Sequence, residues 1–403
     1  MKYTEQEVIQ FASEEDVKFI RLAFCDVFGK QKNISIMPSE LERAFRFGIA
    51  IDASAIRGFC GEEKSDLFLH PDPDTLAVLP WRPEHGKVVR MFCTVTYPDG
   101  RTFENDTRSI LIDAAEKAKK AGYNFYFGSE LEFYLFKTDE NGDPTKNVFD
   151  NAGYMDMAPE DKGENVRREI CLTLEQMGIY PEASHHEEGP GQNEVDFLYS
   201  EALCAADNAM AFSTVVKAIA ARNGLFADFS PKPLEDQPGN GFHINISVRS
   251  ESGEDVTKYI IAGILEKISE MTVFLNTTED SYMRLGSKKA PEYISWSSEN
   301  RSQLIRVPAA KGEFKRVELR SPDPYANPYL AFALIIYAGL YGIENKLLPP
   351  DSADVNMYTA SEDTKSRYKN LPQSLGAAGK AALESSFINS HLPRKLVETY
   401  CKQ

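Results

Sequence analysis

The chain carries the segment HHEEGPGQNEVDF at residues 185–197, which joins two groups of acidic side chains through a Gly-Pro-Gly turn. Two histidines and two glutamates precede the turn, and after it the polar residues Gln192, Glu194 and Asp196 alternate with apolar ones. This period of two predicts a strand with one polar and one apolar face. A solvated loop would also explain so much acid, so a functional interpretation depends on whether other segments bring matching groups.

Three further segments show the same alternation. They are FYFGSELEFYLF (125–136), GFHINISV (241–248) and KRVELRS (315–321). Their polar faces carry Glu130 and Glu132, His243, and Glu318 respectively, and adjacent carboxylates on one face repel each other unless a cation lies between them. The alternative for each strand alone is an edge whose polar side meets water. Together the four strands predict a sheet with helices on its apolar side and a charged cleft on the other.

The charged faces combine five glutamates with one histidine. These residues are Glu130, Glu132, Glu187, Glu194, His243 and Glu318. Such hard oxygen ligands suit magnesium or manganese better than zinc, and five carboxylates exceed what one divalent ion needs. We therefore expect two or three ions that bridge a polyphosphate.

Arginines follow in the carboxyl-terminal third. They are Arg284, Arg301, Arg306, Arg316 and Arg320. Arginine forks match phosphate and carboxylate oxygens, although surface salt bridges are the alternative for any one of them. The sequence has no G-x-x-x-x-G-K-[ST] and no G-x-G-x-x-G segment, so ATP would be bound through metal and arginine rather than through a glycine loop.

Length and charge limit the class of protein. A chain of 403 residues predicts two domains, and a net charge of −16 argues against a nucleic-acid or anionic-membrane partner. The amino-terminal segment has no apolar leader, and six scattered cysteines predict free thiols in a reducing cytoplasm. A β-rich unit ends near residue 104, where a helical pattern begins at Thr107, and the remainder is α+β without a strand-helix repeat.

These motifs resemble class I glutamine synthetases, and the resemblance covers nearly the whole chain. The segments that carry it include IRLAFCDVFGKQKN, IDASAIRGF, GSELEFYLF, HHEEGPGQNEVDF, GNGFHINIS, NRSQLIRVPAA and KRVELRSPDPYANPYLAFAL. The resemblance implies a β-grasp domain at residues 1–104. It also implies a catalytic domain at 105–403, with a curved antiparallel sheet flanked by helices. It further implies a homo-oligomer, a dodecamer of two hexameric rings, with active sites between neighbouring subunits.

The resemblance also implies roles for individual residues. Glu132, Glu187 and Glu194 would bind one metal ion, and Glu130, His243 and Glu318 another. Arg301, Arg306 and Arg316 would contact the ATP phosphates, and Glu182 and Ser247 the rest of the nucleotide. Arg284, Arg320 and Gly239 would bind glutamate, and Asp52 of a neighbouring subunit would bind ammonium and accept its proton. Asp52, Arg301 and Arg320 are the residues assigned to catalysis.

The implied reaction is ATP-dependent formation of glutamine from glutamate and ammonia through γ-glutamyl phosphate. Two departures from the family pattern affect the substrates: Lys289 replaces a flap glutamate that helps bind ammonium, and Pro238 replaces an asparagine beside the glutamate site. A lysine would repel a cation. The alternative function is therefore a γ-glutamyl-amine ligase that uses an alkylamine, a polyamine or another acid.

Overall fold

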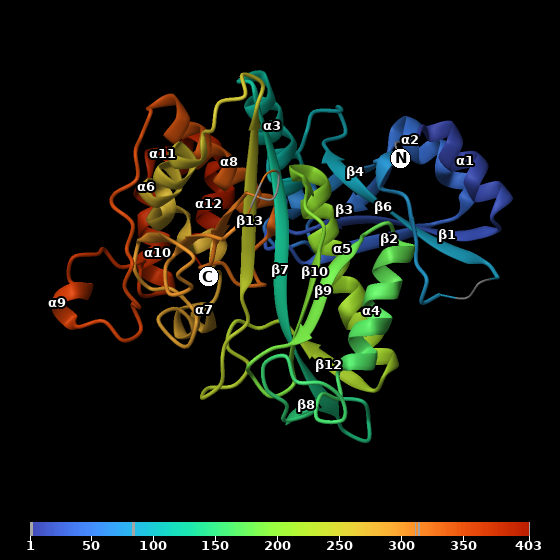
Figure 1. Ribbon diagram of the computed structural model, residues 1–403. Coiled ribbons are helices and arrows are strands. Elements are labelled where there is room, and N and C mark those ends of the chain that lie inside the picture. Colours follow the sequence, from blue (N-terminus) through green and yellow to red (C-terminus); the bar gives the residue numbers. More distant parts are fainter. Residues whose placement is uncertain (1–2, 83–84, 311, 313–314, 403) are drawn as a thin grey trace.

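The computed structural model describes residues 3–82, 85–310, 312 and 315–402. Its amino-terminal part is a six-stranded sheet in the order β2 (Gln31–Ile36), β1 (Val17–Cys25), β6 (Lys87–Thr96), β4 (Asp66–Pro71) and β3 (Ile49–Asp52), with β5 (Ala77–Val78) paired to β6. The central pair, β1 and β6, is parallel, while β1 and β2 form an antiparallel hairpin. Helices α1 (Glu5–Glu14) and α2 (Leu41–Phe47) complete this unit, on the right of Figure 1. The small β-rich domain predicted from the sequence is confirmed.

The hairpin between β1 and β2 is closed by local hydrogen bonds. The Asp26 carboxylate accepts from the backbone N–H groups of Phe28 and Lys30 at 3.1 and 2.9 Å, and Gly29 adopts φ +76°. An aspartate that bonds the following backbone and a glycine at positive φ are typical turn residues. The turn then reaches the second domain, because a Cβ at Gly29 would lie 2.9 Å from the Asn327 Cα.

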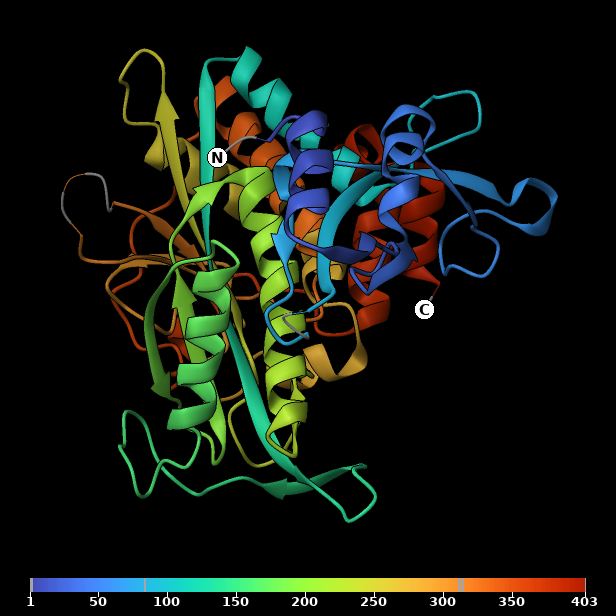
Figure 2. The ribbon, with the colours of Figure 1, turned by 90° about the vertical axis from the view of Figure 1, so that its right-hand side faces the viewer.

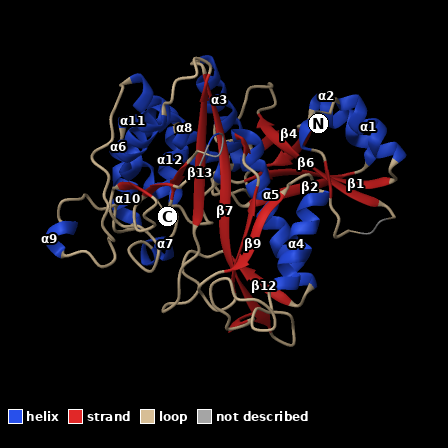
Figure 3. Ribbon diagram, in the orientation of Figure 1, coloured by secondary structure: helices blue, strands red, loops and turns tan. Residues whose placement is uncertain are grey.

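The second domain is built on the long strand β7 (Tyr123–Thr138), which crosses the centre of Figures 1 and 3. Its ten-stranded sheet runs β14 (Trp296–Ser298), β15 (Ile305–Val307), β16 (Val317–Leu319), β13 (Phe242–Ser250), β7, β10 (Gln192–Phe197) and β9 (Pro181–His186). Strands β8 (Pro144–Val148), β11 (Ser200–Glu201) and β12 (Leu225–Asp228) also pair with β7. The sheet is antiparallel as predicted, except that the short edge strands β14 and β15 are parallel.

Helices cover the apolar face of this sheet, as predicted. Helices α3 (Thr107–Lys120) and α5 (Ala202–Arg222) pack on β7, and α4 (Glu164–Gln176) packs on α5 and β9. Helix α8 (Pro328–Glu344) packs on α3 and on α6 (Thr257–Leu275), as Figures 1 and 2 show. The shorter helices are α7 (Glu279–Arg284), α9 (Glu362–Lys365), α10 (Leu375–Glu384), α11 (Ser386–His391) and α12 (Arg394–Cys401).

Helix α5 is the one helix among the described residues that is long and apolar enough to cross a membrane. Most of it is buried, and it packs on β7, β12, α4 and α8, so it is a core helix. All six cysteines are free thiols, as the sequence predicted.

Asn327 joins the two domains at the start of α8. Its side-chain oxygen accepts from the Tyr329 N–H at 3.0 Å, and its side-chain nitrogen donates to Val27 O and to Thr107 Oγ1, both at 3.1 Å. The side chain is fully buried. One residue therefore caps a helix and also satisfies buried groups from both domains.

We expect Asn327→Ala to lower the free energy of unfolding by about 2–3 kcal/mol, because it removes a helix cap and leaves buried groups without partners. Urea unfolding followed by circular dichroism measures this loss. Asn345→Ala is the control, since Asn345 ends the same helix and donates from an exposed position to Tyr341 O at 2.9 Å. Equal destabilisation by both variants would show that Asn327 does not connect the domains.

Candidate active site

The strand register places the predicted site residues side by side. Across β7 and β10, Glu132 is opposite Glu194, while Glu130 is opposite Asp196 on one side and His243 of β13 on the other. Further along the sheet, Glu318 of β16 is opposite Asn245 of β13 on one side and Arg306 of β15 on the other. Directly opposed residues on one face lie about 4.5–5.5 Å apart, so the sheet itself concentrates these charges.

A cavity of 580 Å³ opens over this charged face. Eleven of the predicted site residues line it: Glu130, Glu132, Glu187, Glu194, Gly239, His243, Arg284, Arg301, Arg306, Arg316 and Arg320. Glu318 is buried beside it, 1% exposed, with its carboxylate 4.0 Å from His243 Nδ1. Acidic residues and arginines therefore share one enclosure, as the strand alternation predicted.

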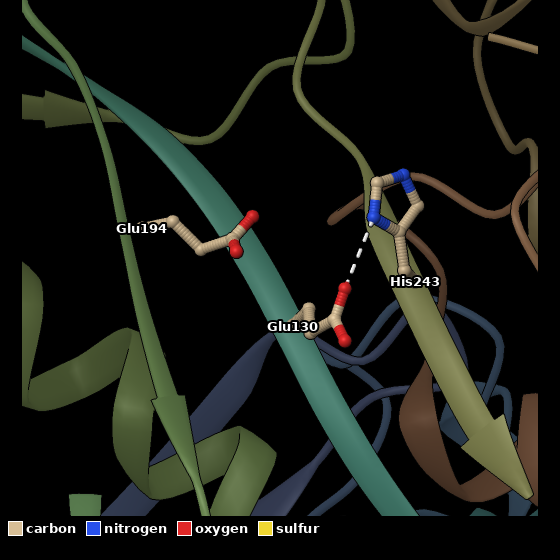
Figure 4. A group of neighbouring side chains, drawn as sticks. All are labelled: Glu130, Glu194 and His243. Atoms are coloured by element: carbon tan, nitrogen blue, oxygen red, sulfur yellow. Dashed lines mark ion pairs between the residues drawn. The ribbon is translucent and has the colours of Figure 1, made fainter. Parts of the chain in front are cut away.

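Two groups of side chains in this cavity could hold a cation. Glu130, Glu194 and His243 form one, shown in Figure 4, and His185, Glu187 and Glu194 form the other. In the first group, His243 Nδ1 lies 3.4 Å from a Glu130 oxygen. Glu194 belongs to both groups and comes from β10, between the other ligands.

The acid–base state of these carboxylates fits a bound cation. Burial and the charge of Glu132 raise the pKa of Glu187 to about 8, despite the opposing charge of Lys289. Burial and the neighbouring Asp196 also raise the pKa of Glu194, and burial and Glu130 raise that of Asp196 to about 7. For Glu130, burial is outweighed by the hydrogen bond and charge of His243, and its pKa falls to about 2. Crowded carboxylates that resist ionisation together are relieved by a divalent ion.

The two histidines of the 185–197 segment differ. His186 is fully buried and points away from the cavity, with Nε2 2.8 Å from Asp150 and Nδ1 2.6 Å from Glu187 O. His185 lies in the cavity, 3.6 Å from Glu187 and 3.4 Å from Glu194. The assignment of His243 as a metal ligand stays a prediction.

The arginines, which come from the carboxyl-terminal third of the chain, form one side of the cavity. Arg306 Nη1 donates to Glu318 at 2.6 Å, and Arg320 Nε donates to the same carboxylate at 3.1 Å. Arg316 Nε donates to Asn245 Oδ1 at 2.9 Å. Arg284 is 2% exposed and donates to backbone oxygens of the Arg320–Ser321 segment. Hydrogen bonds to the protein thus hold these four guanidinium groups in position.

Gly239 lies where the backbone passes close to the Arg284 side chain. A Cβ there would lie 2.4 Å from Pro231 O and 2.9 Å from the Arg284 side chain, so only glycine fits. The neighbouring Pro238 accepts a 2.7 Å hydrogen bond from Tyr134 through its carbonyl. Proline supplies no N–H at this point of the cavity.

A second cavity of 280 Å³ adjoins the first and shares Glu130, Asp196 and Arg316 with it. Glu182 and Ser247, the residues expected to contact the nucleotide, both line it. Tyr126 and Tyr199 add aromatic surface. The arrangement offers an extended ligand one charged end and one less charged end.

Asp52 is not brought to this site within one chain. It ends β3, is exposed, and accepts hydrogen bonds from the Ser54 N–H and Oγ at 2.9 and 2.6 Å. It lines neither cavity. A role for Asp52 requires a second subunit, as the resemblance implied.

Several contacts of cavity residues were not predicted from the sequence. Lys289 pairs with Glu188 at 2.8 Å, and its ammonium lies 5.0 Å from the Tyr154 ring centroid. The backbone of Lys289 has φ +61°. Gln192 donates to Glu132 at 3.2 Å. The alternation of β10 already placed Gln192 and Asp196 on the face of Glu194, whereas nothing in the sequence pairs Glu188 with Lys289.

Comparison with known proteins agrees with this architecture. Residues 16–98 match the glutamine synthetase β-grasp domain, and residues 104–403 match the glutamine synthetase catalytic domain. Over 389 residues the chain is 46% identical to a glutamine synthetase of Clostridium saccharobutylicum, covering 93% of this chain and 88% of that protein. It is 43% identical to a glutamine synthetase of Methanosarcina mazei over 413 residues, covering 98% and 92%.

Solved structures of GmaS are similar throughout. The GmaS complex with ADP superposes with a TM-score of 0.89 at 28% identity, covering 98% of this chain and 94% of that one. The GmaS structure without ligand gives 0.88. The fold and site thus define an ATP-dependent ligase. The chain belongs to the glutamine synthetase family.

Proposed function

We propose that this protein forms glutamine from glutamate and ammonia, using ATP, through a γ-glutamyl phosphate intermediate. The observation that carries the proposal is the single cavity in which carboxylates and His243 on one side face fixed arginines on the other. Family membership supports it, since the similar curated proteins are glutamine synthetases. The similar GmaS structure is a complex with ADP, which supports a nucleotide as a ligand of this fold.

Each group of residues has a part in this proposal. Glu132, Glu187 and Glu194 would hold one Mg²⁺ or Mn²⁺ ion and Glu130, His243 and Glu318 another, within an expected total of two or three ions. When bound, the ions supply positive charge that polarises the phosphates of ATP. Glu182 and Ser247 would contact the remainder of the nucleotide. The site residues stay predictions until variants are measured.

The arginines would act on the reacting groups. Arg284 and Arg320, with the bare backbone at Gly239, would orient the glutamate carboxylates. The γ-carboxylate oxygen attacks the terminal phosphorus and ADP leaves, while Arg301, Arg306 and Arg316 stabilise the charge on the phosphoryl oxygens. Ammonia then attacks the acyl carbon, and phosphate leaves. Asp52 of a neighbouring subunit would bind ammonium and take its proton.

Assembly and location follow the same proposal. With a β-grasp domain at residues 1–104 and a catalytic domain at 105–403, Asp52 belongs to the β-grasp domain. A dodecamer of two hexameric rings would bring this domain of one subunit, and with it Asp52, to the cavity of a neighbouring subunit. The net charge of −16 and six free thiols support a cytoplasmic enzyme without nucleic-acid or membrane partners. Phosphate release with ATP, magnesium and glutamate tests the function. Release that does not depend on ammonium at any pH would refute it.

A second candidate, a γ-glutamyl-amine ligase for an alkylamine, a polyamine or another acid, is motivated by Lys289 and Pro238, which both line the cavity. The lysine ammonium lies at the cavity wall, near Glu187 and Tyr154, and repels a small cation. The structural similarity to GmaS keeps this candidate open. A panel of amines and amino acids in the same assay decides, since a product only with ammonia and glutamate would eliminate it.

Lys289→Glu is expected to raise ammonium-dependent kcat/KM about tenfold if the wild-type rate is low, because a favourable charge replaces a repulsive one. Lys288→Glu is the matched control: the same charge change, one residue earlier, at an exposed position that also lines the cavity. Steady-state kinetics with varied ammonium measures both. A rate at or below wild type in Lys289→Glu, or an equal gain in the control, would remove the lysine as the limiting feature.

A further inference from the structure

A further cavity, separate from the two already described, lies between the amino-terminal sheet and helix α5, and arginines line it. We call it the interdomain pocket; it has a volume of 160 Å³, and its walls include Arg21, Asn33, Trp81, Arg90, Met177 and Thr214. Strands β1, β2 and β6 form one side, and α5 forms the other. Thr214 Oγ1 of α5 donates to Gln31 of β2 at 3.0 Å and closes part of the boundary.

The pocket is built around two arginines in direct register. Arg21 of β1 and Arg90 of β6 are paired across the parallel strands. Neighbouring strands lie about 4.8 Å apart, and like charges directly opposite destabilise a sheet. Among the described residues, no carboxylate lines the pocket. The sheet thus holds two adjacent cations with no counter-charge in the pocket wall as the structure describes it.

Arg90 is nine-tenths buried, and few of its donors are used. It is 7% exposed, and its guanidinium carbon lies 3.9 Å from the Phe92 ring centroid, which covers one face of the group. Within the described residues, its side chain makes one long hydrogen bond, from Nη1 to Thr75 O at 3.5 Å. A guanidinium has five N–H donors, so most of those on Arg90 lack a protein acceptor.

Electrostatics agree with this geometry. Burial lowers the pKa of Arg90 to about 10, although Asp207 opposes that effect. Burial and Arg82 also lower the pKa of Arg21. Both shifts report cations that are poorly compensated, and an anion between them would supply the missing charge.

We propose that the interdomain pocket binds a small anion through a carboxylate or phosphate group held by Arg21 and Arg90. Arginine forks match both groups, and Asn33 can donate a further hydrogen bond. The volume corresponds to about five water molecules at roughly 30 Å³ each, too small for a nucleotide. Leu79, Met177 and Ala211 supply apolar wall, which suits the short stem of an organic acid. The ligand would bridge the two domains.

Trp81 reports binding directly. The chain has two tryptophans, so Trp296→Phe leaves Trp81 as the only indole. In that background, fluorescence is titrated with acetate, succinate and inorganic phosphate, with chloride at the same ionic strength as the reference. We expect saturable change with at least one probe, and the rank order separates carboxylates from phosphate. We also expect that probe to raise the melting temperature, since it binds only the folded protein.

Variants connect the signal to the arginines. Arg90→Gln and Arg21→Gln should each weaken binding about tenfold or more, because each removes charge-assisted hydrogen bonds. Arg21 is only partly buried, so its variant decides the matter if Arg90→Gln fails to fold. Lys18→Gln, an exposed charge loss on the same strand, should leave binding unchanged. No saturable change with any probe, or unchanged affinity in both arginine variants, would overturn the proposal.

Discussion

Glu194→Gln is expected to raise the melting temperature of the metal-free protein while it lowers ATP-dependent ligation about 10²–10³-fold. Glu194 is 6% exposed and belongs to both candidate cation groups. Burial and the charges of Asp196, Glu132 and Glu130 raise its pKa well above the usual value. Without a cation, an ionised Glu194 is therefore a cost to the folded state, and a neutral side chain of the same shape removes that cost.

The pH dependence has a definite sign. Because the folded pKa of Glu194 is higher than the unfolded value, the unfolded chain releases the proton first and stability falls as pH rises above that value. The gain in Glu194→Gln should consequently grow from pH 4.5 toward neutrality and vanish in acid, where both proteins are uncharged at this position. The expected loss of activity follows from the prediction that Glu194 binds a metal ion. Such an ion contributes several kcal/mol to charge stabilisation, and about 1.36 kcal/mol corresponds to a tenfold change in rate.

Thermal denaturation with and without magnesium, together with the phosphate-release assay, measures this pair of effects. Magnesium should stabilise the wild type more than Glu194→Gln. Glu175→Gln is the control, since Glu175 is an exposed glutamate on α4 and should change neither quantity. A variant that loses activity but is also less stable without metal would show that Glu194 has a structural role instead.

Period-two patterning was sufficient to predict which side chains share a face. It placed Glu130, Glu132 and Glu194 toward one cleft, and all three line the cavity. The strand of Glu318 was predicted too long, since β16 covers only Val317–Leu319, yet its polar face was correct. Alternation is a local property of the backbone, so a single sequence contains it.

Contacts between distant segments, including the register between strands, are not local, and the features missed from sequence depend on them. The apposition of Arg21 with Arg90 joins strands nearly seventy residues apart. The ion pair between Lys289 and Glu188 joins the loop that carries Lys289 to the turn after β9. These pairings depend on how the chain closes in three dimensions, which residue spacing does not state.

Glu318→Gln should have the opposite effect on stability, although the residue is predicted to serve the same metal centre. Its carboxylate is 1% exposed and accepts hydrogen bonds from Arg306 at 2.6 Å and from Arg320 at 3.1 Å. Removing that charge leaves two guanidinium groups without their shared partner, and Arg320 is itself 2% exposed. Breaking a buried ion pair from one side costs about 3–5 kcal/mol. Ligation should again fall about 10²–10³-fold.

A double-mutant cycle separates the buried ion pair from simple misfolding. Glu318→Gln, Arg306→Gln and the double variant are compared by urea unfolding without metal. Because each single variant already removes the Arg306–Glu318 interaction, which can be lost only once, the double should be less destabilised than the sum of the singles. Additive losses would mean that Arg306 does not stabilise Glu318. If the coupling holds, arginines of the protein compensate the charge of Glu318, whereas the charge of Glu194 would be compensated by the predicted metal ion.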